Sequence, residues 1–295
     1  MTALNLESGL ASAPAASTAT RHRRANRAVF WIAVGVTLLW VTPFYYAAIT
    51  IFKSGADYVA GGPLALPTSL TPLLDNIAQA WVRTSMASGM LNSALYGTVG
   101  AGAAVLIAAM AAFGLARLDF RGRPFWFLLI FSGTVFPFQI YLIPLFQSYA
   151  RLGLLDSRIG LLLVYIAICI PFPTLVLKNY MGQLPRDFDE AARMDGCSEW
   201  RIFRSIVLPN CRGPLIATFL LQFNWIWNDL VFSMVLTSDE SKRSIMNALM
   251  VFQGNYAGTT PNLVVTATVL ASLPTLALFF VLRRYFMEGL SLQTA

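Results

Sequence analysis

The chain has 295 residues, of which 57% are apolar and only 12% are charged, about half the charged share of an ordinary soluble domain. So little polar surface cannot cover a globule in water, which excludes a soluble domain and indicates an integral membrane protein. The net charge of +7 does not indicate nucleic-acid binding, because no basic face is interleaved with stacking aromatic side chains.

Apolar runs long enough to cross a bilayer recur along the chain. About 20 residues of helix, at 1.5 Å each, cross roughly 30 Å of hydrocarbon. Six runs reach this length, near residues 29–52, 89–115, 124–146, 159–181, 213–236 and 263–285. Their uninterrupted apolar character predicts helices rather than the alternating strands of a membrane barrel. The expected fold class is therefore an all-α integral membrane protein with six transmembrane helices and both chain ends on one side.

The basic residues indicate the orientation of these helices. Most of the 21 Lys and Arg residues fall on the side that holds both termini and the 182–212 loop. Because short cytoplasmic loops retain positive residues, that side is predicted to be cytoplasmic.

The two ends of the chain are expected to lie outside the membrane domain of residues 29–286. Residues 1–28, rich in Ala, Ser and Thr with a basic cluster, predict a disordered cytoplasmic tail, and residues 287–295 a second one. A cleavable export signal is disfavoured, because its apolar core needs only about 7–15 residues and the run that follows here is longer. A transit peptide, which is also Arg-rich and acid-poor, remains an alternative.

Metal-binding and catalytic residues are sparse. Cys169 lies in the fourth run, Cys197 and Cys211 lie in the 182–212 loop without CxxC spacing, and the single histidine is His22. No metal site and no catalytic residues are predicted from this set.

A phosphate-binding loop is also missing from the sequence. The three lysines, Lys53, Lys178 and Lys242, follow Phe, Leu and Ser, whereas such a loop needs Gly-Lys-Ser/Thr after a Gly-rich turn. Any ATP-driven motor must therefore be another polypeptide.

The second run contains regularly spaced small residues, and the third contains prolines. Ser93, Gly97 and Ala101 at four-residue spacing favour close helix packing, with a gate as the alternative. Pro137 and Pro144 predict bending of the third run.

The fifth run is the least lipid-like and suggests a lining for a translocation path. It contains Asn224, Trp227, Asn228 and Asp229, and Gln139 is a primary amide inside the third run. Indole faces beside amide and carboxylate groups suit a polyhydroxylated solute. The alternative is an interfacial anchor of Trp and a snorkelling acid, and a neighbouring helix is an alternative partner for Gln139.

The 182–212 loop predicts a helix, a sharp bend and a second helix. Pro185 opens the first helix, whose early acidic residues suit a helix N-terminus. One apolar face is expected to combine Leu184 and Phe188 with Ala191 or Ala192. Gly196 permits a left-handed turn, Ser198 caps the second helix and Pro209 stops it. A compact, partly apolar projection of this kind suits a groove in a partner protein.

This loop carries a family signature. Glu190-Ala191-Ala192, Gly196 and Ile206-Val207-Leu208-Pro209 resemble the EAA motif of ABC-importer permeases. The resemblance covers about residues 136–289 and is closest to the smaller membrane subunit of the maltose-type carbohydrate permeases. It is carried further by Ile143-Pro144-Leu145, Leu152 to Asp156, Asn179-Tyr180-Met181, Trp227-Asn228-Asp229 and Tyr285 to Leu290.

The resemblance implies a six-helix type I importer permease rather than an enzyme, in a bacterial cytoplasmic membrane. Its implied partners are a second homologous permease, two copies of an ATPase that binds ATP and Mg, and a periplasmic or lipoprotein substrate-binding protein. It implies that the ATPase is coupled through Glu190, Ala191, Ala192, Asp195, Gly196, Ile206, Leu208 and Pro209. The implied solute is a sugar, oligosaccharide or polyol.

Two departures and two alternatives accompany this interpretation. The chain ends at Ala295 without the Gly- and Lys-containing end common in the family, so a tail contact with the ATPase is not implied. In the best-understood relatives the sugar can be held mainly by the partner permease, so Asn224, Trp227 and Asn228 can line a path without choosing the solute. The alternatives are import of a peptide, amino acid or osmolyte by the same kind of permease, and a membrane-embedded enzyme or scaffold.

Overall fold

The computed structural model describes residues 16–253 and 260–291, with side chains described for residues 29–253 and 260–281. These residues form helices and no strand. The α-helices are α1 (Ala16–Thr50), α2 (Gly55–Gly61), α3 (Pro72–Arg83), α4 (Met86–Leu95), α5 (Ala101–Arg117), α6 (Arg123–Val135), α7 (Leu142–Leu152), α8 (Arg158–Cys169), α9 (Pro171–Gln183), α10 (Asp187–Met194), α11 (Glu199–Ile202), α12 (Leu208–Asn210), α13 (Arg212–Trp227), α14 (Val231–Leu236), α15 (Ile245–Ala248) and α16 (Pro261–Ser291). They are joined in places by π-helices η1 (Tyr96–Gly100) and η3 (Phe203–Val207) and 3-10 helices η2 (Phe138–Tyr141) and η4 (Leu249–Gln253).

Four stretches within the described residues are long and apolar enough to span a membrane. They are Val29–Thr50, Met86–Arg117, Arg158–Gln183 and Pro261–Val281. Two bent pairs, Arg123–Val135 with Phe138–Leu152 and Glu199–Asn210 with Arg212–Trp227, raise the number to six if each counts as one span. The all-helical prediction is confirmed, and the six predicted spans are found only on that condition.

The third span is broken rather than continuous. The sequence predicted one bent helix over residues 124–146, whereas α6 stops at Val135 and the chain turns by 91° before the next helix. Phe136 is extended (φ −73°, ψ 127°) because the ring of Pro137 disfavours the helical conformation in the residue before it.

The fifth span is also shorter than predicted. The expected run was residues 213–236, but α13 ends at Trp227 and α14 begins only at Val231. Asp229 therefore lies in a break between two helices, where backbone N–H groups need side-chain acceptors.

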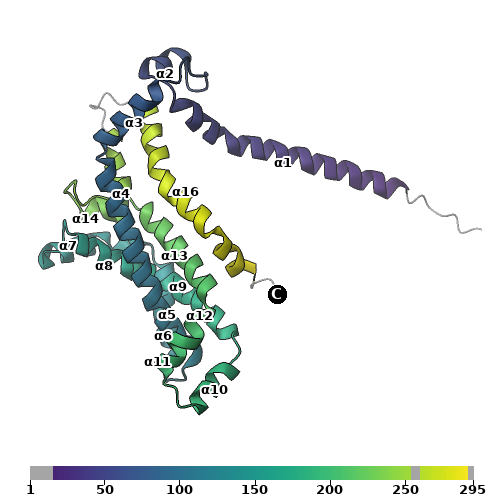
Figure 1. The fold of residues 1–295 in the computed structure, drawn as a ribbon, viewed down its shortest axis with the longest axis vertical. Helices are drawn as coiled ribbons and strands as arrows, with labels where there is room; N and C mark the ends of the chain where they lie inside the picture. Colours follow the sequence, from purple (N-terminus) through teal and green to yellow (C-terminus); the bar gives the residue numbers. More distant parts are fainter. Residues whose placement is uncertain (1–15, 254–259, 292–295) are drawn as a thin grey trace, which may run out of the picture.

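Helix α1 leaves the bundle and extends into space on its own (Figure 1). Of its described side chains, only Ile49 and Thr50 in the last turn are buried. The helix begins at Ala16, so residues 16–28, predicted as part of a disordered tail, continue it, because no Gly or Pro interrupts them. Residues 1–15 lie outside the described residues.

At the other end of the chain, α16 runs to Ser291 and takes in part of the predicted tail 287–295. Residues 292–295 lie outside the described part of the structure.

The connection after α1 is held by buried polar groups. Lys53 is 1% exposed, and its ammonium donates 3.0 Å hydrogen bonds to the carbonyls of Gly62 and Pro63. The amide of Asn76 donates to the Lys53 carbonyl at 2.8 Å and accepts from Asn262 of α16 at 2.7 Å. These bonds fix the end of α1 to α3 and α16.

Close helix packing accounts for the small residues of the second span. A Cβ on Gly97 would lie 2.7 Å from the ring of Phe223, so α13 approaches η1 only because this residue is glycine. The hydroxyl of Ser93 accepts a 2.8 Å hydrogen bond from the N–H of Ile245, and Ala101 is fully buried. The packing interpretation of this stripe is the one that the contacts support.

The 237–244 loop is tied to α4 and α8 by many polar contacts. Asn92 donates to the carbonyls of Ser241 and Arg243 at 2.8 and 3.1 Å. The carboxylate of Asp156 accepts from the N–H groups of Ser238 and Asp239 at 3.0 and 2.9 Å. The loop is therefore a fixed part of the bundle.

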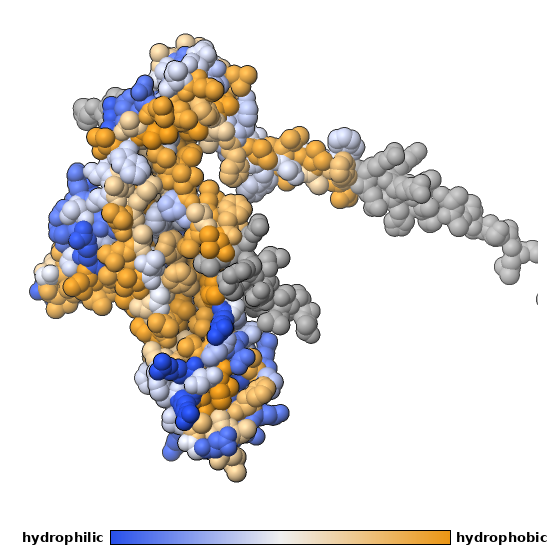
Figure 2. Space-filling model, viewed as in Figure 1, coloured by the Kyte–Doolittle hydropathy of each residue, from blue (hydrophilic) through white to orange (hydrophobic). Residues whose placement is uncertain are grey.

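Helix α2 lies at one end of the molecule, and α10 and α11 lie at the other (Figure 1). Figure 2 shows apolar side chains over much of the middle of the molecule and along α1, with hydrophilic side chains at the end that carries α10 and α11, along the left edge and near α2. This distribution suits a middle section within lipid and an end in water.

Candidate functional site

Helix α10 attaches to the bundle through one ion pair and one apolar residue. Three acidic residues in its first turn suit the helix N-terminus. Of its eight residues, Asp189 and Ala192 are buried. The Asp189 carboxylate lies 3.4 Å from Nε of Arg117, the last residue of α5, and Arg117 also donates to the Leu184 carbonyl at 3.0 Å. The other residues of α10 are exposed.

A tight bend at Gly196 ends this helix. Gly196 has φ +78°, in the left-handed region that glycine adopts without a steric cost. Its N–H donates to the Arg193 carbonyl at 3.0 Å, and the Cys197 N–H donates to the Ala192 carbonyl at 2.9 Å. Apart from its two chain neighbours, no described residue has an atom within 4 Å of the position that a Cβ would take, so only the backbone conformation would oppose a side chain there. The predicted left-handed turn is confirmed.

The arm after the bend starts with a cap. The hydroxyl of Ser198 accepts from the N–H of Arg201 at 3.4 Å, as predicted. Arg193 donates two hydrogen bonds, of 2.7 and 3.1 Å, to the Glu199 carboxylate and so links the two arms. The hydrogen bond from Arg193 lowers the pKa of Glu199.

The second arm packs firmly on α5 and α9. One apolar cluster joins the arm and these helices, and includes Ile202, Phe203, Val207 and Cys211 with Phe113, Leu177 and Met181. Ile206, Leu208 and Pro209 are half-buried beside it. Movement of this arm must therefore move α5 and α9, because close-packed side chains transmit displacement.

The outward face of α10 combines charged and apolar side chains. Glu190, Ala191 and Asp195 are exposed, as are Phe188 (62%) and Met194 (88%). The sequence grouped Phe188 with Ala191 or Ala192; the structure selects Ala191, because Ala192 faces the bundle. Exposed apolar side chains at a hydrophilic end indicate a protein contact.

Trp227 does not line an open path in this conformation. The residue is 2% exposed, and its ring stacks on that of Phe223 at 5.7 Å between centroids. Its Nε1 donates a 3.0 Å hydrogen bond to the Ala271 carbonyl of α16. A buried, fully partnered indole holds α13 against α16 and has no face left for a solute.

Asp229 is likewise buried and faces the bundle interior. Its carboxylate accepts from the Tyr165 hydroxyl at 2.8 Å and from the N–H groups of Phe232 and Ser233 at 3.4 and 3.2 Å. The side chain thus satisfies the open N-terminus of α14. These contacts contradict the interfacial-anchor alternative for this residue.

The three predicted amides lie at the surface of this chain. Gln139 is exposed on η2, and Asn224 and Asn228 are exposed on one face of α13. The Asn228 amide donates to the side-chain oxygen of Asn224 at 3.1 Å. The structure does not bring Gln139 together with this pair.

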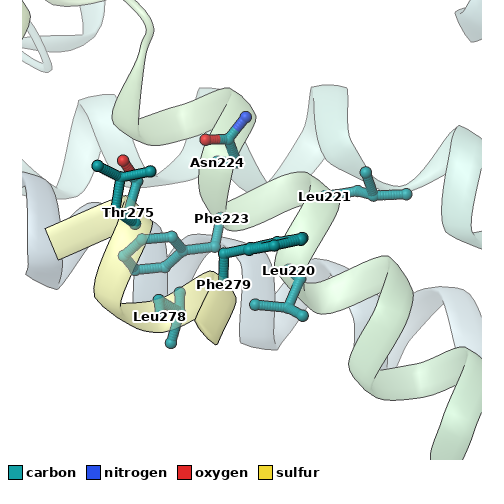
Figure 3. Close-up of a pocket in the computed structure, with 8 residues that line it drawn as sticks. Leu220, Leu221, Phe223, Asn224, Thr275, Leu278 and Phe279 are labelled. Atoms are coloured by element: carbon teal, nitrogen blue, oxygen red, sulfur yellow. The ribbon is translucent and has the colours of Figure 1, made fainter. Parts of the chain in front are cut away.

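A pocket of about 280 Å³ beside Asn224 lies between α13 and α16 (Figure 3). Asn224 and Thr275 are its polar lining residues, and Phe223 and Phe279 form much of its wall. The pocket is otherwise apolar.

A second hollow, of about 400 Å³, lies between the break in the third span and α13. Its lining includes Phe138, Tyr141, Phe172, Gln222 and Trp225. Gln222 is 8% exposed, and its amide makes no hydrogen bond within the described residues. Aromatic rings beside an unpartnered amide form a surface for a solute with hydroxyl groups.

The sequence interpretation missed Gln222 and Trp225, although helical spacing could have found them. They are three residues apart and share a face of α13, whereas Asn224 and Asn228 are four apart on another. If the residues of the fifth run had been sorted by helix face, Gln222 and Trp225, which line the hollow, would have been separated from Asn224 and Asn228.

The sequence matches the model of a known protein family. Residues 104–291 match the model described as binding-protein-dependent transport system inner membrane component. The chain belongs to this family. The predicted ABC-importer permease is thereby confirmed, and the chain is a membrane transport subunit rather than an enzyme.

Relatives of this permease differ in the solutes that their names mention. The diacetylchitobiose uptake system permease protein NgcG of Streptomyces coelicolor is 31% identical over 215 residues, which cover 72% of this chain and 70% of the relative. The osmoprotective compounds uptake permease protein GgtD of Synechocystis is 30% identical over 263 residues, which cover 86% of this chain and 87% of the relative.

A solved structure confirms the type I importer permease fold. A chain of a bacterial ABC transporter involved in the import of the acidic polysaccharide alginate superposes with a TM-score of 0.79. The match covers 90% of this permease and 98% of that chain, at 24% sequence identity.

Proposed function

We propose that this permease imports a carbohydrate, and that the 400 Å³ hollow beside α13 is part of its path. The observation that carries the proposal is the side chain of Gln222, a residue only 8% exposed, in the lining of the hollow beside the ring of Trp225. An indole stacks on the apolar C–H face of a sugar while an amide binds its hydroxyls. The named solutes of the Streptomyces relative and the alginate transporter belong to the same chemical class.

We further propose that α10 and its bend dock on a separate ATPase that binds ATP and Mg. The contact residues are those of the EAA motif, namely Glu190, Ala191, Ala192, Asp195, Gly196, Ile206, Leu208 and Pro209. The exposed Glu190 and Ala191, beside the apolar Phe188 and Met194, support this role. In the assembly we expect a second permease, two ATPase copies and a substrate-binding protein, with both chain ends and α10 on the cytoplasmic side.

The solute class is tested by transport in proteoliposomes made with the purified native complex and its binding protein. We expect ATP-dependent uptake of labelled oligosaccharides. Gln222→Ala and Trp225→Ala should reduce uptake while the complex remains intact. Trp40→Ala is the matched control, because Trp40 is 72% exposed on α1, away from the hollow. Equal uptake by the two hollow variants and wild type would remove the hollow from the path.

An osmolyte is the second candidate solute, favoured by the Synechocystis relative that takes up osmoprotective compounds. A thermal-shift screen of the cognate binding protein distinguishes the two, because a bound solute raises the melting temperature of the protein that binds it. A shift with small osmolytes and none with oligosaccharides would replace the carbohydrate proposal.

A further inference from the structure

Three elements meet at one guanidinium. Arg117 ends α5, donates to the carbonyl of Leu184 at the end of α9, and faces the Asp189 carboxylate in the first turn of α10. Both side chains of the ion pair are at most 3% exposed. Since Ala192 is the other buried residue of α10, this pair is the polar attachment of α10 to α5.

The pair is buried without complete hydrogen bonding. Nε of Arg117 lies 3.4 Å from Asp189, yet neither Nε nor Nη1 has a hydrogen-bond partner among the described residues. A cavity of about 120 Å³, lined by Arg117, Asp189, Phe188 and Ile206 among others, lies beside them. The carboxylate therefore has room and unused donors for a second position, whereas removing either charge would leave the other buried and unpaired.

We propose that the Arg117–Asp189 pair is the joint through which displacement of α10 reaches α5. The charges stay paired while α10 shifts towards the cavity, so a movement of α10 moves the end of α5. Arg117 is thus a positioning residue for energy coupling. The inference rests on the coupling role proposed above for α10.

A surface pair of nearly the same length provides the matched control. Arg123 and Asp119 lie 3.5 Å apart, near the same end of α5, but the Asp119 side chain is 87% exposed. Exposed pairs contribute little because water screens both charges, and this one joins neighbours four residues apart.

The experiment measures ATP hydrolysis with and without solute-loaded binding protein, together with uptake, in proteoliposomes containing the complete transporter. Asp189→Asn and Arg117→Gln should retain the ATPase subunits and the unstimulated hydrolysis. We expect stimulation and uptake to fall by at least about fivefold, the lower end of the usual range for coupling between two sites. Asp119→Asn should match wild type. The charge reversal Arg117→Asp with Asp189→Arg should recover stimulation, because it restores the ion pair. A purely structural role would instead lower the bound ATPase and the unstimulated hydrolysis together with the stimulation.

Three outcomes would contradict the role proposed for the Arg117–Asp189 pair. They are wild-type stimulation in both single variants, loss of the ATPase subunits from either, and an effect of Asp119→Asn as large as that of Asp189→Asn. Glu190→Lys in the same assay tests the docking surface separately. If Glu190→Lys uncouples the transporter and Asp189→Asn does not, the docking surface stands and the joint fails.

Discussion

Two segments at the surface of the molecule are attached to the bundle in opposite ways. The 237–244 loop is bound to α4 and α8 by Asn92, Asp156 and Arg158, each through one or more hydrogen bonds to its backbone. Helix α10, by contrast, is held to α5 by one buried ion pair and the side chain of Ala192, and to the second arm by the exposed Arg193–Glu199 pair. The first arrangement fixes the loop at many points, and the second holds the helix at few. The contrast predicts that variants in the 237–244 loop and its partners lower stability, whereas variants at α10 uncouple transport.

The largest effect is expected at Gly196. Gly196→Val should abolish stimulation of ATP hydrolysis while the chain stays in the membrane, because a side chain at φ +78° costs about 1–2 kcal/mol. Gly196→Asn is the control, since asparagine enters this region more readily and no neighbour crowds the site. Equal stimulation by wild type and the Val variant would show that the bend is not needed for coupling.

A stability effect is expected at Asp229. Asp229→Ala leaves the buried Tyr165 hydroxyl and two backbone N–H groups without their acceptor, at about 1–3 kcal/mol for each group. The melting temperature of the purified complex should therefore fall, together with the amount in the membrane. Asp229→Asn keeps one acceptor oxygen and should lose less. Normal stability with reduced uptake would instead restore a direct transport role.

Cysteine labelling tests both the accessibility and the side of α10. Cys197 is half-exposed at the bend, whereas Cys211 is fully buried. Maleimide should modify Cys197 in opened membranes and leave Cys211 unmodified until the protein is denatured. Membrane-impermeant maleimide should modify neither in intact cells. Labelling of Cys197 from outside would reverse the proposed orientation.

The smallest effect is a loosening of the 237–244 loop in acid. The N–H of Ser241 is the main cause that lowers the pKa of Asp239 to about 2, and the N–H of Asp239 is the main cause that lowers the pKa of Asp156. A carboxyl with a depressed folded pKa stabilises fully above its unfolded pKa, about 3.9, and loses this as pH falls through the folded value. Amide protection in the loop should stay constant from about pH 7 to 5 and fall below about pH 4. A decline already above pH 5 would contradict this.

The features that were predicted correctly from the sequence are those that depend on a single residue and its neighbours in the chain. Gly196 and Ser198 have fixed backbone or capping roles, so the bend and the second arm were foreseen from single residues. Pro137 was expected to bend the third span, but not to break it by 91°, because the size of a break depends on what packs around it. Trp227 and Asp229 were read as path residues from their chemistry alone. Their burial follows from α16 and Tyr165, which are distant in sequence.

The role proposed for Arg117 could not be predicted from the sequence, for the same reason. A basic residue at a helix end near the predicted cytoplasmic surface has no local mark that separates it from its neighbours Arg121 and Arg123. Only the fold brings Leu184 and Asp189 to its guanidinium. Such pairs are set by tertiary contacts, which a single sequence does not reveal.

The isolation of α1 divides the folding of the chain into two separable steps. Neither apolar core cluster contains a described residue of α1, and the contacts described between this helix and the rest lie near its end, at Ile49 and Thr50, at the Tyr46–Tyr58 hydrogen bond and at the clamp formed by Lys53. Insertion of α1 into lipid is then governed by hydropathy alone, before any packing partner is needed. The remainder can assemble afterwards around its own contacts, so exchanging one apolar residue for another along α1 should leave the bundle intact.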